Sequence, residues 1–418
     1  MRPVVQYELL NKDVPVLVFA YDEATHRVVD VVRVLEPAFA PPSIVSFDGT
    51  ISAADVSWWW QHRSIPASRN QINRLKRSLG IEDASELLER NSALSLSDRY
   101  WVRPEGSGLA WADVNFFDND FSDELGRLTL EPSLSPAAAQ LDDDDLMSPN
   151  SSVMGDVPKK WVIGKGGVRW LVKAGTRLFD QDVFNEIVAS ALYRRLLAPE
   201  DFVTYQLLEH DGAAYCACPN MLGPDEELVT AADLLRRHRH EERYGTYGSV
   251  LEALGATGLG DSVLRRGLSQ VFSCDFLLAN ADRHTGNFGV IRNCVTLRYT
   301  RLAPTWDAGF SLWCDRRRLE HPFDYAYSPR PFTGRPAESP EQQLKLFDDY
   351  TWLPTSYPVE LAAWRDEALE ILTGNPLMPA GRIEAIARGI GLNVREFERH
   401  VERMAQLFPD RGASRKNK

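Results

Sequence analysis

The sequence predicts an α+β fold in which a mixed α/β N-terminal domain precedes a second domain that begins with a strand hairpin and ends in helices. Three observations lead to this prediction. Short β-like runs alternate with helical segments in the first 130 residues, and after residue 150 a strand hairpin precedes an amphipathic helix. Near the C-terminus one apolar stripe marks a long helix, formed by Val394, Phe397, Val401, Met404 and Leu407.

Length and composition indicate a folded protein of more than one domain. The chain has 418 residues, enough for about two or three domains, and its 44% hydrophobic and 25% charged residues are typical of globular proteins. The net charge of −12, from 47 basic and 59 acidic residues, disfavours a protein that coats nucleic acid by bulk charge. Because the sequence has no run of about 18 apolar residues and no signal-peptide pattern at its start, we expect a cytoplasmic protein without membrane contact.

Residues 1–130 are predicted to form the N-terminal accessory domain. Val16–Tyr21 and Val28–Leu35 are β-like, and the segments Ser52–His62 and Ser68–Leu79 are helical in pattern. Three consecutive tryptophans, Trp58–Trp60, precede a cluster of basic residues that could contact phosphates: Arg63, Arg69, Arg74, Lys76 and Arg77. Tryptophans in a helix more often fill a core and basic residues more often face solvent, so we expect no direct binding of nucleic acid.

An acidic linker rich in Pro and Ser is predicted at residues 131–150, where four consecutive aspartates replace apolar periodicity. Residues 151–222 would form the N lobe. In it, Trp161–Ile163 and Val168–Val172 read as strands joined by a Gly-rich turn, and an amphipathic helix follows. Residues 223–410 would form the helical C lobe, which includes a long apolar helix at Leu264–Ala279, and residues 411–418 a basic tail.

The five cysteines are predicted to be buried, reduced thiols. Their odd number and apolar neighbours fit a reducing compartment. Cys216 and Cys218 are the closest pair, but His210, His238 and His240 do not complete a metal-ligand spacing with them.

The residues that point most directly to chemistry follow the long apolar helix. Asp282 and Asn287 are five positions apart, and Asp307-Ala308-Gly309 comes twenty residues later. Phosphoryl transfer from ATP needs an acceptor for the substrate hydroxyl proton and oxygen ligands that hold Mg²⁺ against the phosphates. The pattern Asp-x-x-x-x-Asn followed by Asp-x-Gly supplies these groups, so the sequence predicts a kinase that uses ATP and Mg²⁺.

A cation for the ATP phosphates and its acidic partner are also present. Lys173 ends the strand-like run Trp170–Val172, and Glu186 follows thirteen residues later on the amphipathic helix. This is the order expected of the strand lysine of a kinase and the helix glutamate that pairs with it.

Two stretches could cover the phosphates, namely 151–159 and the hairpin turn Gly164–Gly167. Backbone N–H groups of a turn that contains Gly or Ser can cradle phosphate oxygens. For the hairpin turn an ordinary reversal of the chain is the favoured interpretation. Neither stretch fits G-x-x-x-x-G-K-[ST], which disfavours a P-loop NTPase.

From about Ser151 to Leu312 the sequence resembles the HipA family of serine/threonine kinases, including its CtkA-like stand-alone relatives. The pieces that carry the resemblance are S-S-V-M-G-D-V-P-K, W-L-V-K, F-N-E-I-V-A-S-A-L, N-A-D-R-H-T-G-N-F-G-V and A-P-T-W-D-A-G-F-S-L. The most specific is Asp-Arg-His, which stands where eukaryotic-type kinases have His-Arg-Asp. The resemblance implies a two-lobed, protein-kinase-like catalytic domain.

By this resemblance Asp282 would be the catalytic base, and Asn287 and Asp307 the Mg²⁺ ligands. Lys173 would contact the ATP phosphates with Glu186 as its partner. The loop that contains Gly155 and Lys159 would cover the nucleotide, although it departs from the family pattern G-A-Q-x-K.

The resemblance also implies a regulatory serine in this loop. Ser152 is at the position that family members autophosphorylate to switch themselves off, and Ser151 is the adjacent candidate. A phosphate there would bring about −1.5 to −2 charges to the place of the ATP phosphates. By position, Met221 follows the strand that would lead into the hinge and is a candidate contact for the nucleotide base.

Several alternatives stay open at this stage. Arg283 and His284 either brace the loop or take part in catalysis directly. A small-molecule phosphotransferase uses a related layout of acidic residues and is the alternative activity. A pseudokinase or binding module is disfavoured because all four residues that phosphoryl transfer needs are present, namely Lys173, Asp282, Asn287 and Asp307. The resemblance further implies a protein substrate with a Ser or Thr acceptor, such as a translation factor, and an antitoxin partner.

Overall fold

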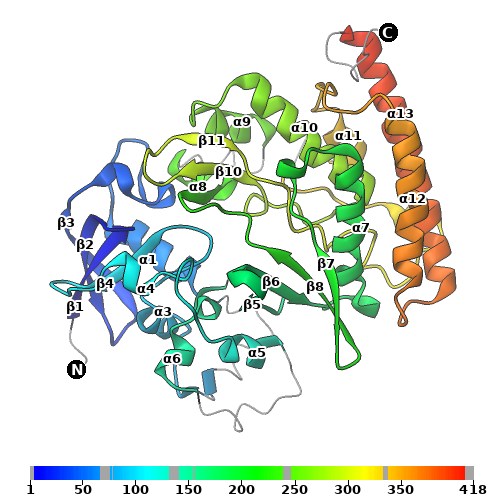
Figure 1. The fold of residues 1–418 in the computed structure, drawn as a ribbon. Coiled ribbons are helices and arrows are strands. Elements are labelled where there is room, and N and C mark those ends of the chain that lie inside the picture. Colours follow the sequence, from blue (N-terminus) through cyan, green and yellow to red (C-terminus); the bar gives the residue numbers. More distant parts are fainter. Residues whose placement is uncertain are drawn as a thin grey trace.

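The computed structural model describes residues 4–65, 76–77, 79–130, 141–153, 155, 157–238, 246–332 and 338–409. Three antiparallel sheets and a set of helices make up this part of the chain (Figure 1). The sheets follow one another along the sequence, and the longest helices lie at the C-terminal side. This arrangement agrees with the predicted α+β class.

The N-terminal sheet has the strand order β3-β2-β1-β4. Its strands are β1 (Val4–Asn11), β2 (Val14–Asp22), β3 (Arg27–Val34) and β4 (Tyr100–Pro104), and helix α1 (Ala53–Arg63) packs on it. Ser52 caps α1 by accepting from Asp55 N, so the helix begins where the sequence pattern placed it.

The tryptophans of α1 have different environments. Trp60 is fully buried and packs on Tyr21, and Trp59 is also buried, which confirms their predicted structural role. Trp58 is half-buried. Of the neighbouring basic residues, Arg63 turns inward and forms a forked ion pair with Asp98, whereas Arg69 and Arg74 lie outside the described residues.

Short helices lie on both sides of β4 in the sequence. Helix α3 (Glu86–Arg90) precedes β4, and the connection from β4 to the next sheet contains α4 (Trp111–Val114), α5 (Glu124–Leu130), α6 (Asp143–Leu146) and a 3-10 turn at Pro149–Ser152. Residues 131–140 of the predicted linker lie outside the described part of the chain. The remainder of the linker forms α6 and the start of the 3-10 turn, with Asp142 capping α6.

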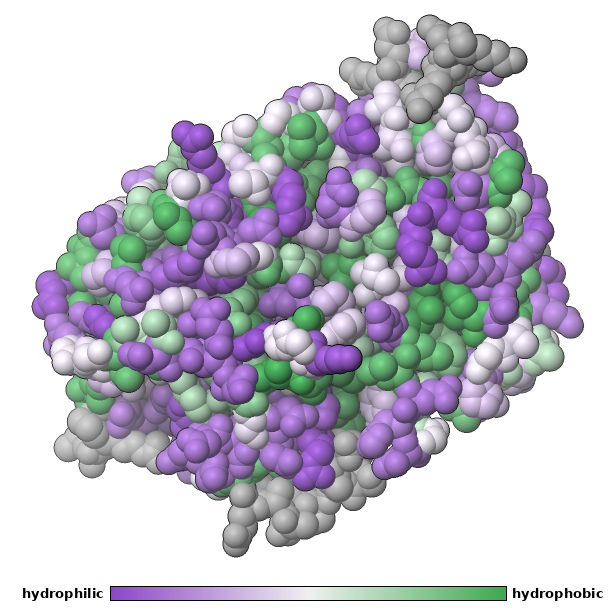
Figure 2. Space-filling model, in the orientation of Figure 1, coloured by the Kyte–Doolittle hydropathy of each residue, from purple (hydrophilic) through white to green (hydrophobic). Residues whose placement is uncertain are grey.

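The middle sheet has the order β5-β6-β8-β7. Its strands are β5 (Lys159–Ile163), β6 (Arg169–Ala174), β7 (Gln206–His210) and β8 (Ala213–Pro219), and helix α7 (Gln181–Leu196) lies between β6 and β7 in sequence. The β5–β6 hairpin and α7 confirm the predicted hairpin and helix. The predicted amphipathic character of α7 is wrong, because the helix is buried on nearly all of its faces, its polar residues Asn185 and Glu186 included. Figure 2 shows a largely hydrophilic face on which apolar surface gathers near this sheet and α7.

The third sheet, β11-β10-β9, consists of β9 (Glu226–Thr230), β10 (Gly289–Asn293) and β11 (Tyr299–Leu302). Gly289 is required because a Cβ at this position would lie 2.2 Å from the carbonyl oxygen of Val229 on the neighbouring strand. The helices of this half are α8 (Ala231–His238), α9 (Tyr247–Gly255), α10 (Asp261–Leu278), α11 (Pro340–Leu344), α12 (Tyr357–Thr373) and α13 (Ala380–Leu407).

One core unites α7 with the C-terminal helices. Trp364 of α12 is fully buried and donates from Nε1 to the carbonyl oxygen of Val188 on α7, at 3.1 Å. Ile386 and Phe397 of α13 are also fully buried in this core. The stripe Val394–Leu407 is therefore part of a real helix, as predicted.

The N-terminal domain packs directly on the third sheet. Leu228 N donates to Ser97 O at 3.0 Å, and the buried Arg292 of β10 donates to the hydroxyl of Tyr100 on β4. At the sheet edge Lys12 pairs with Asp225 at 2.6 Å. These contacts fix residues 95–100 beside the strand that leads into α8.

The five cysteines are all buried and free, as predicted. Within the described residues no group of three or more His, Cys, Asp or Glu side chains could hold a metal ion. None of the described helices is long and apolar enough to cross a membrane.

Candidate active site

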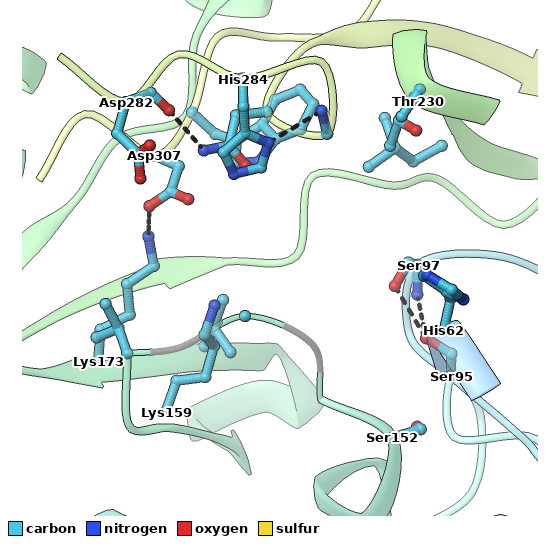
Figure 3. A pocket seen from close by; sticks show the side chains of 18 of the residues that line it. His62, Ser95, Ser97, Ser152, Lys159, Lys173, Thr230, Asp282, His284 and Asp307 are labelled. Atoms are coloured by element: carbon cyan, nitrogen blue, oxygen red, sulfur yellow. Dashed lines mark hydrogen bonds and ion pairs between the residues drawn. The ribbon is translucent and has the colours of Figure 1, made fainter. Parts of the chain in front are cut away.

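A cavity of about 540 Å³ lies where the middle sheet, the third sheet and the N-terminal domain meet (Figure 3). Its lining includes nearly all residues that the sequence singled out for phosphoryl transfer: Ser152, Gly155, Lys159, Lys173, Glu186, Asp282, Asn287 and Asp307. These residues are up to 155 positions apart in the sequence, from 152 to 307. The fold therefore brings the predicted catalytic residues into one site.

Lys173 is held between two carboxylates. Its Nζ lies 2.8 Å from Glu186 Oε1 and 2.7 Å from Asp307 Oδ1, and the lysine is buried. Burial alone would lower the pKa of Lys173, but Asp307 and Glu186 outweigh it and hold the pKa well above its ordinary value. The ammonium group therefore stays charged and points into the cavity from the end of β6.

Asp307 has an unusual backbone conformation that places its carboxylate. Its φ is +58°, in the left-handed region that few residues other than Gly adopt. Two side chains of α7 hold the backbone that follows Asp307. Glu186 Oε2 accepts from Ala308 N at 3.0 Å, and Asn185 Nδ2 donates to Gly309 O at 2.8 Å. Although burial acts to raise the pKa of Asp307, Lys173 and Lys159 hold it below its ordinary value, so this carboxylate is ionised.

Asp282 faces the same cavity from the loop after α10. Its Oδ1 accepts from Arg330 Nη1 at 2.7 Å, and a little over a third of its side chain is exposed. Burial raises the pKa of Asp282 above its ordinary value, although His284 and Arg330 oppose this effect. A carboxylate of raised pKa at the mouth of a cavity is suited to accept a proton.

Arg283 braces the loop from behind. It is fully buried, and its Nε and Nη2 donate to Asp275 of α10 at 2.8 and 2.9 Å. It also donates to the carbonyl oxygens of Asn287 and Trp306. Asn287 is the last residue of the first acidic motif, and Trp306 directly precedes Asp307 of the second. Arg283 therefore supports the catalytic loop from within the core. His284 instead lines the cavity, and its Nδ1 accepts a hydrogen bond from Gly286 N.

Asn287 and Asp307 fit a Mg²⁺ ion. The amide nitrogen of Asn287 donates to Asp282 O at 3.4 Å, and Asp307 Oδ1 pairs with Lys173. This leaves Asn287 Oδ1 and Asp307 Oδ2 without a hydrogen bond from the described residues, and both side chains line the cavity. Two such oxygens suit Mg²⁺, which binds through few protein ligands and keeps substrate phosphates and waters.

Gly155 and Lys159 lie on the opposite side of the cavity, at the start of the middle sheet. The φ of Gly155 is +92°, and a Cβ there would lie 2.7 Å from Lys159 Nζ. Glycine thus lets the backbone approach the lysine closely. Because Lys159 also acts on the pKa of Asp307, two ammonium groups face the acidic side of the site.

The two candidate serines occupy the 3-10 turn before this loop. Ser152 lines the cavity, but its hydroxyl donates to Leu94 O at 2.6 Å and the residue is buried. Ser151 is fully buried, does not line the cavity and donates to Leu146 O at 2.7 Å. Both hydroxyls are thus engaged by backbone carbonyl oxygens in this conformation.

Two sequence-predicted positions lie off the cavity. Met221 packs against the core that joins α7 to the C-terminal helices and is not among the lining residues. The turn Gly164–Gly167 is a 3-10 turn, exposed at Lys165, Gly166 and Gly167, which supports its interpretation as an ordinary chain reversal.

Sequence reasoning missed several residues of the site. Arg330 lies 48 positions from the carboxylate it contacts, in a segment with no recognisable motif. Arg177 lines the cavity and stacks over Phe310 at 4.4 Å. The N-terminal domain contributes a whole wall, in which the tryptophans Trp58 and Trp59 and the neighbouring Arg63 are the residues that the sequence had singled out.

Comparisons with solved structures identify the fold. No protein-family model matches the sequence, and no curated protein matches it. The structure of HipA from Shewanella oneidensis MR-1, in a complex with HipB and its operator DNA, matches 96% of this chain and 99% of its own, with a TM-score of 0.56 and 14% identity. The Helicobacter pylori proinflammatory kinase CtkA matches 60% of this chain and 94% of its own, with a TM-score of 0.46 and 18% identity. The chain therefore has the HipA fold, as the resemblance of its motifs predicted.

Proposed function

We propose that this protein is a HipA-like serine/threonine protein kinase that uses ATP and Mg²⁺. In this proposal residues 151–222 are the N lobe and residues 223–410 the helical C lobe. The observation that carries the proposal is the position of Lys173 Nζ, within 2.8 Å of both Glu186 and Asp307, in the cavity that Asp282 and Asn287 also line. A cation, two metal-ligand oxygens and a base are the groups that phosphoryl transfer requires.

Each residue has a role that follows from its surroundings. Lys173 and Lys159 bind the nucleotide phosphates. Glu186 orients Lys173 by accepting a hydrogen bond of 2.8 Å from its Nζ. Asn287 and Asp307 would hold Mg²⁺, which supplies charge neutralisation at the phosphates when bound. Asp282 accepts the proton of the acceptor hydroxyl, which must first displace Arg330 from the carboxylate.

The position of Asp282 supports an acceptor on a protein. Its side chain is 36% exposed and that of Arg330 is 57% exposed, so the base lies at the mouth of the cavity and not at its closed end. A serine or threonine on the surface of another protein can reach such a position. A cytoplasmic location, expected from the sequence, and a translation factor as substrate, implied by the resemblance, are further parts of the proposal.

A partner protein also belongs to the proposal. The HipA structure that shares this fold contains HipB and operator DNA. On that likeness we include a HipB-like antitoxin, which would be found by copurification with the full-length chain, and a role in growth control.

A small-molecule phosphotransferase is the second candidate. It is favoured by the enclosed form of the cavity, since the N-terminal domain forms one of its walls. The two candidates differ in where the phosphoryl group goes.

The test follows γ-labelled phosphate from ATP. We expect Mg²⁺-dependent label on protein, either on the chain itself or on proteins of a cell extract, with no label in Asp282→Asn and normal label in the matched exposed variant Asp315→Asn. Label in small molecules alone would favour the second candidate, and the absence of any transfer would contradict both.

A further inference from the structure

The carboxylate of Asp282 lies among basic side chains at the mouth of the cavity. Arg330 pairs with it at 2.7 Å, while Arg177 and His284 line the cavity, His284 on the same side as Asp282 (Figure 3). Burial raises the pKa of Asp282, and all three of these side chains act against that effect. An acceptor hydroxyl that approaches this carboxylate therefore meets two arginines and an imidazole.

Arg177 is held beside the catalytic loop. Its backbone N–H donates to Asp182 Oδ1 in the first turn of α7, at 3.2 Å, and its guanidinium lies over the Phe310 ring, 4.4 Å from the centroid. The carbonyl oxygen of Phe310 in turn accepts from Ala281 N at 3.1 Å, directly before Asp282. The backbone contact and the ring beneath it therefore fix Arg177 close to the proposed base.

The guanidinium of Arg177 is a cation without a carboxylate. Apart from its contact with Phe310, this exposed side chain has no ion-pair or hydrogen-bond partner among the described residues. The other carboxylates that line the cavity have partners within the fold: Asp98 pairs with Arg63, Asp182 accepts from Thr176, Glu186 and Asp307 pair with Lys173, and Asp233 accepts from Thr230. A guanidinium that stacks on a ring keeps its N–H edge available, so Arg177 can bind an anion from outside.

Arg330 combines an anchored backbone with an exposed side chain. Its carbonyl oxygen accepts from Nε2 of the buried Gln343 at 3.3 Å, and the next two residues, Pro331 and Phe332, are buried. The side chain of Arg330, by contrast, is exposed where it pairs with Asp282. Exposed ion pairs are weak, so the guanidinium can leave Asp282 for another anion while its backbone stays in place.

We propose that Arg177 and Arg330 form an anion site that recognises an aspartate or glutamate close to the serine or threonine of the acceptor protein. A guanidinium binds a carboxylate through two parallel N–H donors, which suits both arginines to this ligand. Arg330 exchanges Asp282 for the carboxylate of the acceptor, and Asp282 is then free to take the proton of the hydroxyl. An acceptor without an acidic side chain leaves Arg330 on the base.

This inference rests on the proposed function, because it concerns the acceptor of a protein kinase, and it narrows the substrate class to acidic segments. The charge of the chain makes the anion site specific to this place. The net charge is −12, so an arginine without a carboxylate partner beside a cavity does not follow from an excess of basic residues. Opposite charge at the contact also favours acidic partners over basic ones.

The test uses the full-length chain, Mg-ATP and synthetic peptides with a central serine that differ only in whether Glu, Gln or Lys flanks it. We expect kcat/KM for the Glu peptide to exceed that for the Gln peptide about tenfold, with the Lys peptide lowest. Arg177→Gln should remove most of this preference. Arg177→Glu should reverse it in favour of the Lys peptide, which a merely structural role of Arg177 would not produce. The matched control Arg298→Gln, at an exposed arginine between β10 and β11, should keep the wild-type preference.

Other outcomes would overturn the inference. Equal kcat/KM for the Glu and Gln peptides in the wild type would do so, as would label on the chain itself without label on any peptide, and both results would leave the proposed kinase in place. Arg177→Gln with a raised KM for ATP and an equal loss on all peptides would assign Arg177 to the nucleotide phosphates instead. No transfer to the chain, to extract proteins or to peptides would contradict the proposed function and the inference with it.

Discussion

Arg330 and Asp282 form an ion pair in which Nη1 lies 2.7 Å from Oδ1. The carboxylate proposed as the base is therefore engaged by a cation from a segment 48 positions later in the chain. The pair is partly exposed, so it is weak enough to open when an acceptor hydroxyl arrives. It also acts on the protonation of Asp282, because Arg330 is one of the groups that oppose the raised pKa.

Removal of Arg330 should change the pH dependence of the reaction. Burial raises the pKa of Asp282, and Arg330 counteracts it, so Arg330→Ala should raise the pKa further. A base works when deprotonated, and activity falls as the pH drops through its pKa. The acid limb of the kcat/KM profile should therefore move to higher pH in Arg330→Ala, whereas Arg330→Lys and the exposed control Arg317→Ala should keep the wild-type profile. An unchanged acid limb in Arg330→Ala would contradict the role of Asp282 as the titrating group.

Loss of the Lys173 ammonium should destabilise the fold as well as stop ATP binding. Lys173→Met leaves the buried Glu186 carboxylate and Asp307 without their shared cation, which should cost about 3–5 kcal/mol of unfolding free energy. Urea unfolding measures this loss. The double variant Lys173→Met with Glu186→Gln should recover part of it, and Lys165→Met at the exposed hairpin turn should lie within about 0.5 kcal/mol of wild type. A double variant less stable than the single one would be evidence against the charge argument.

Replacement of Arg283 by lysine should misplace the catalytic loop. The guanidinium contacts both oxygens of Asp275 and two backbone carbonyls at once, and an ammonium group cannot span them. We expect Arg283→Lys to lose about 2–3 kcal/mol of stability and to lower kcat more than it changes KM, since Asp282 and Asn287 shift together. Steady-state kinetics and urea unfolding check both effects, with Arg317→Lys as the exposed control. A wild-type kcat in Arg283→Lys would show that the brace is dispensable.

Self-phosphorylation should occur at Ser152 in preference to Ser151. Ser152 lines the cavity, whereas Ser151 points away from it to Leu146 O. Because the Ser152 hydroxyl is bonded to Leu94 O, its modification requires the 3-10 turn to leave its place, and a phosphate of about −1.5 to −2 charges would keep it out. Ser152→Ala should therefore retain activity during incubation with Mg-ATP while the wild type declines. Mass-spectrometric mapping of phosphate to Ser151 would contradict this assignment.

Local sequence patterns were sufficient to predict much of the architecture. The β5–β6 hairpin, α7 and α10 all appear where apolar periodicity and turn residues placed them. The side chain of Ser52 and the carboxylate of Asp55 define the start of α1 by a capping box that is visible within four residues. The order of Lys173, Glu186, Asp282, Asn287 and Asp307 was also enough to expect them in one site, because each has a distinct chemical role in phosphoryl transfer.

Contacts between distant segments could not be predicted in the same way. Arg330 and Asp282 meet because the segment after α10 and the segment before α11 pack together, and no periodicity records that packing. The same holds for Arg99, which donates to the carbonyl oxygen of Gly223 from 124 positions away. The contact of the Arg236 guanidinium with the Trp58 ring depends on the docking of α8 beside α1, whereas the local sequence of Trp58 indicates only a helix.

The role of Asp282 as the base in a self-phosphorylating kinase is tested by the intact mass of the purified 418-residue chain before and after incubation with Mg-ATP, for wild type and Asp282→Asn. We expect the wild type to gain phosphate and Asp282→Asn, with unchanged circular dichroism, to gain none. Equal gain of phosphate in both proteins would contradict the assignment of Asp282 as the base and with it the proposed mechanism.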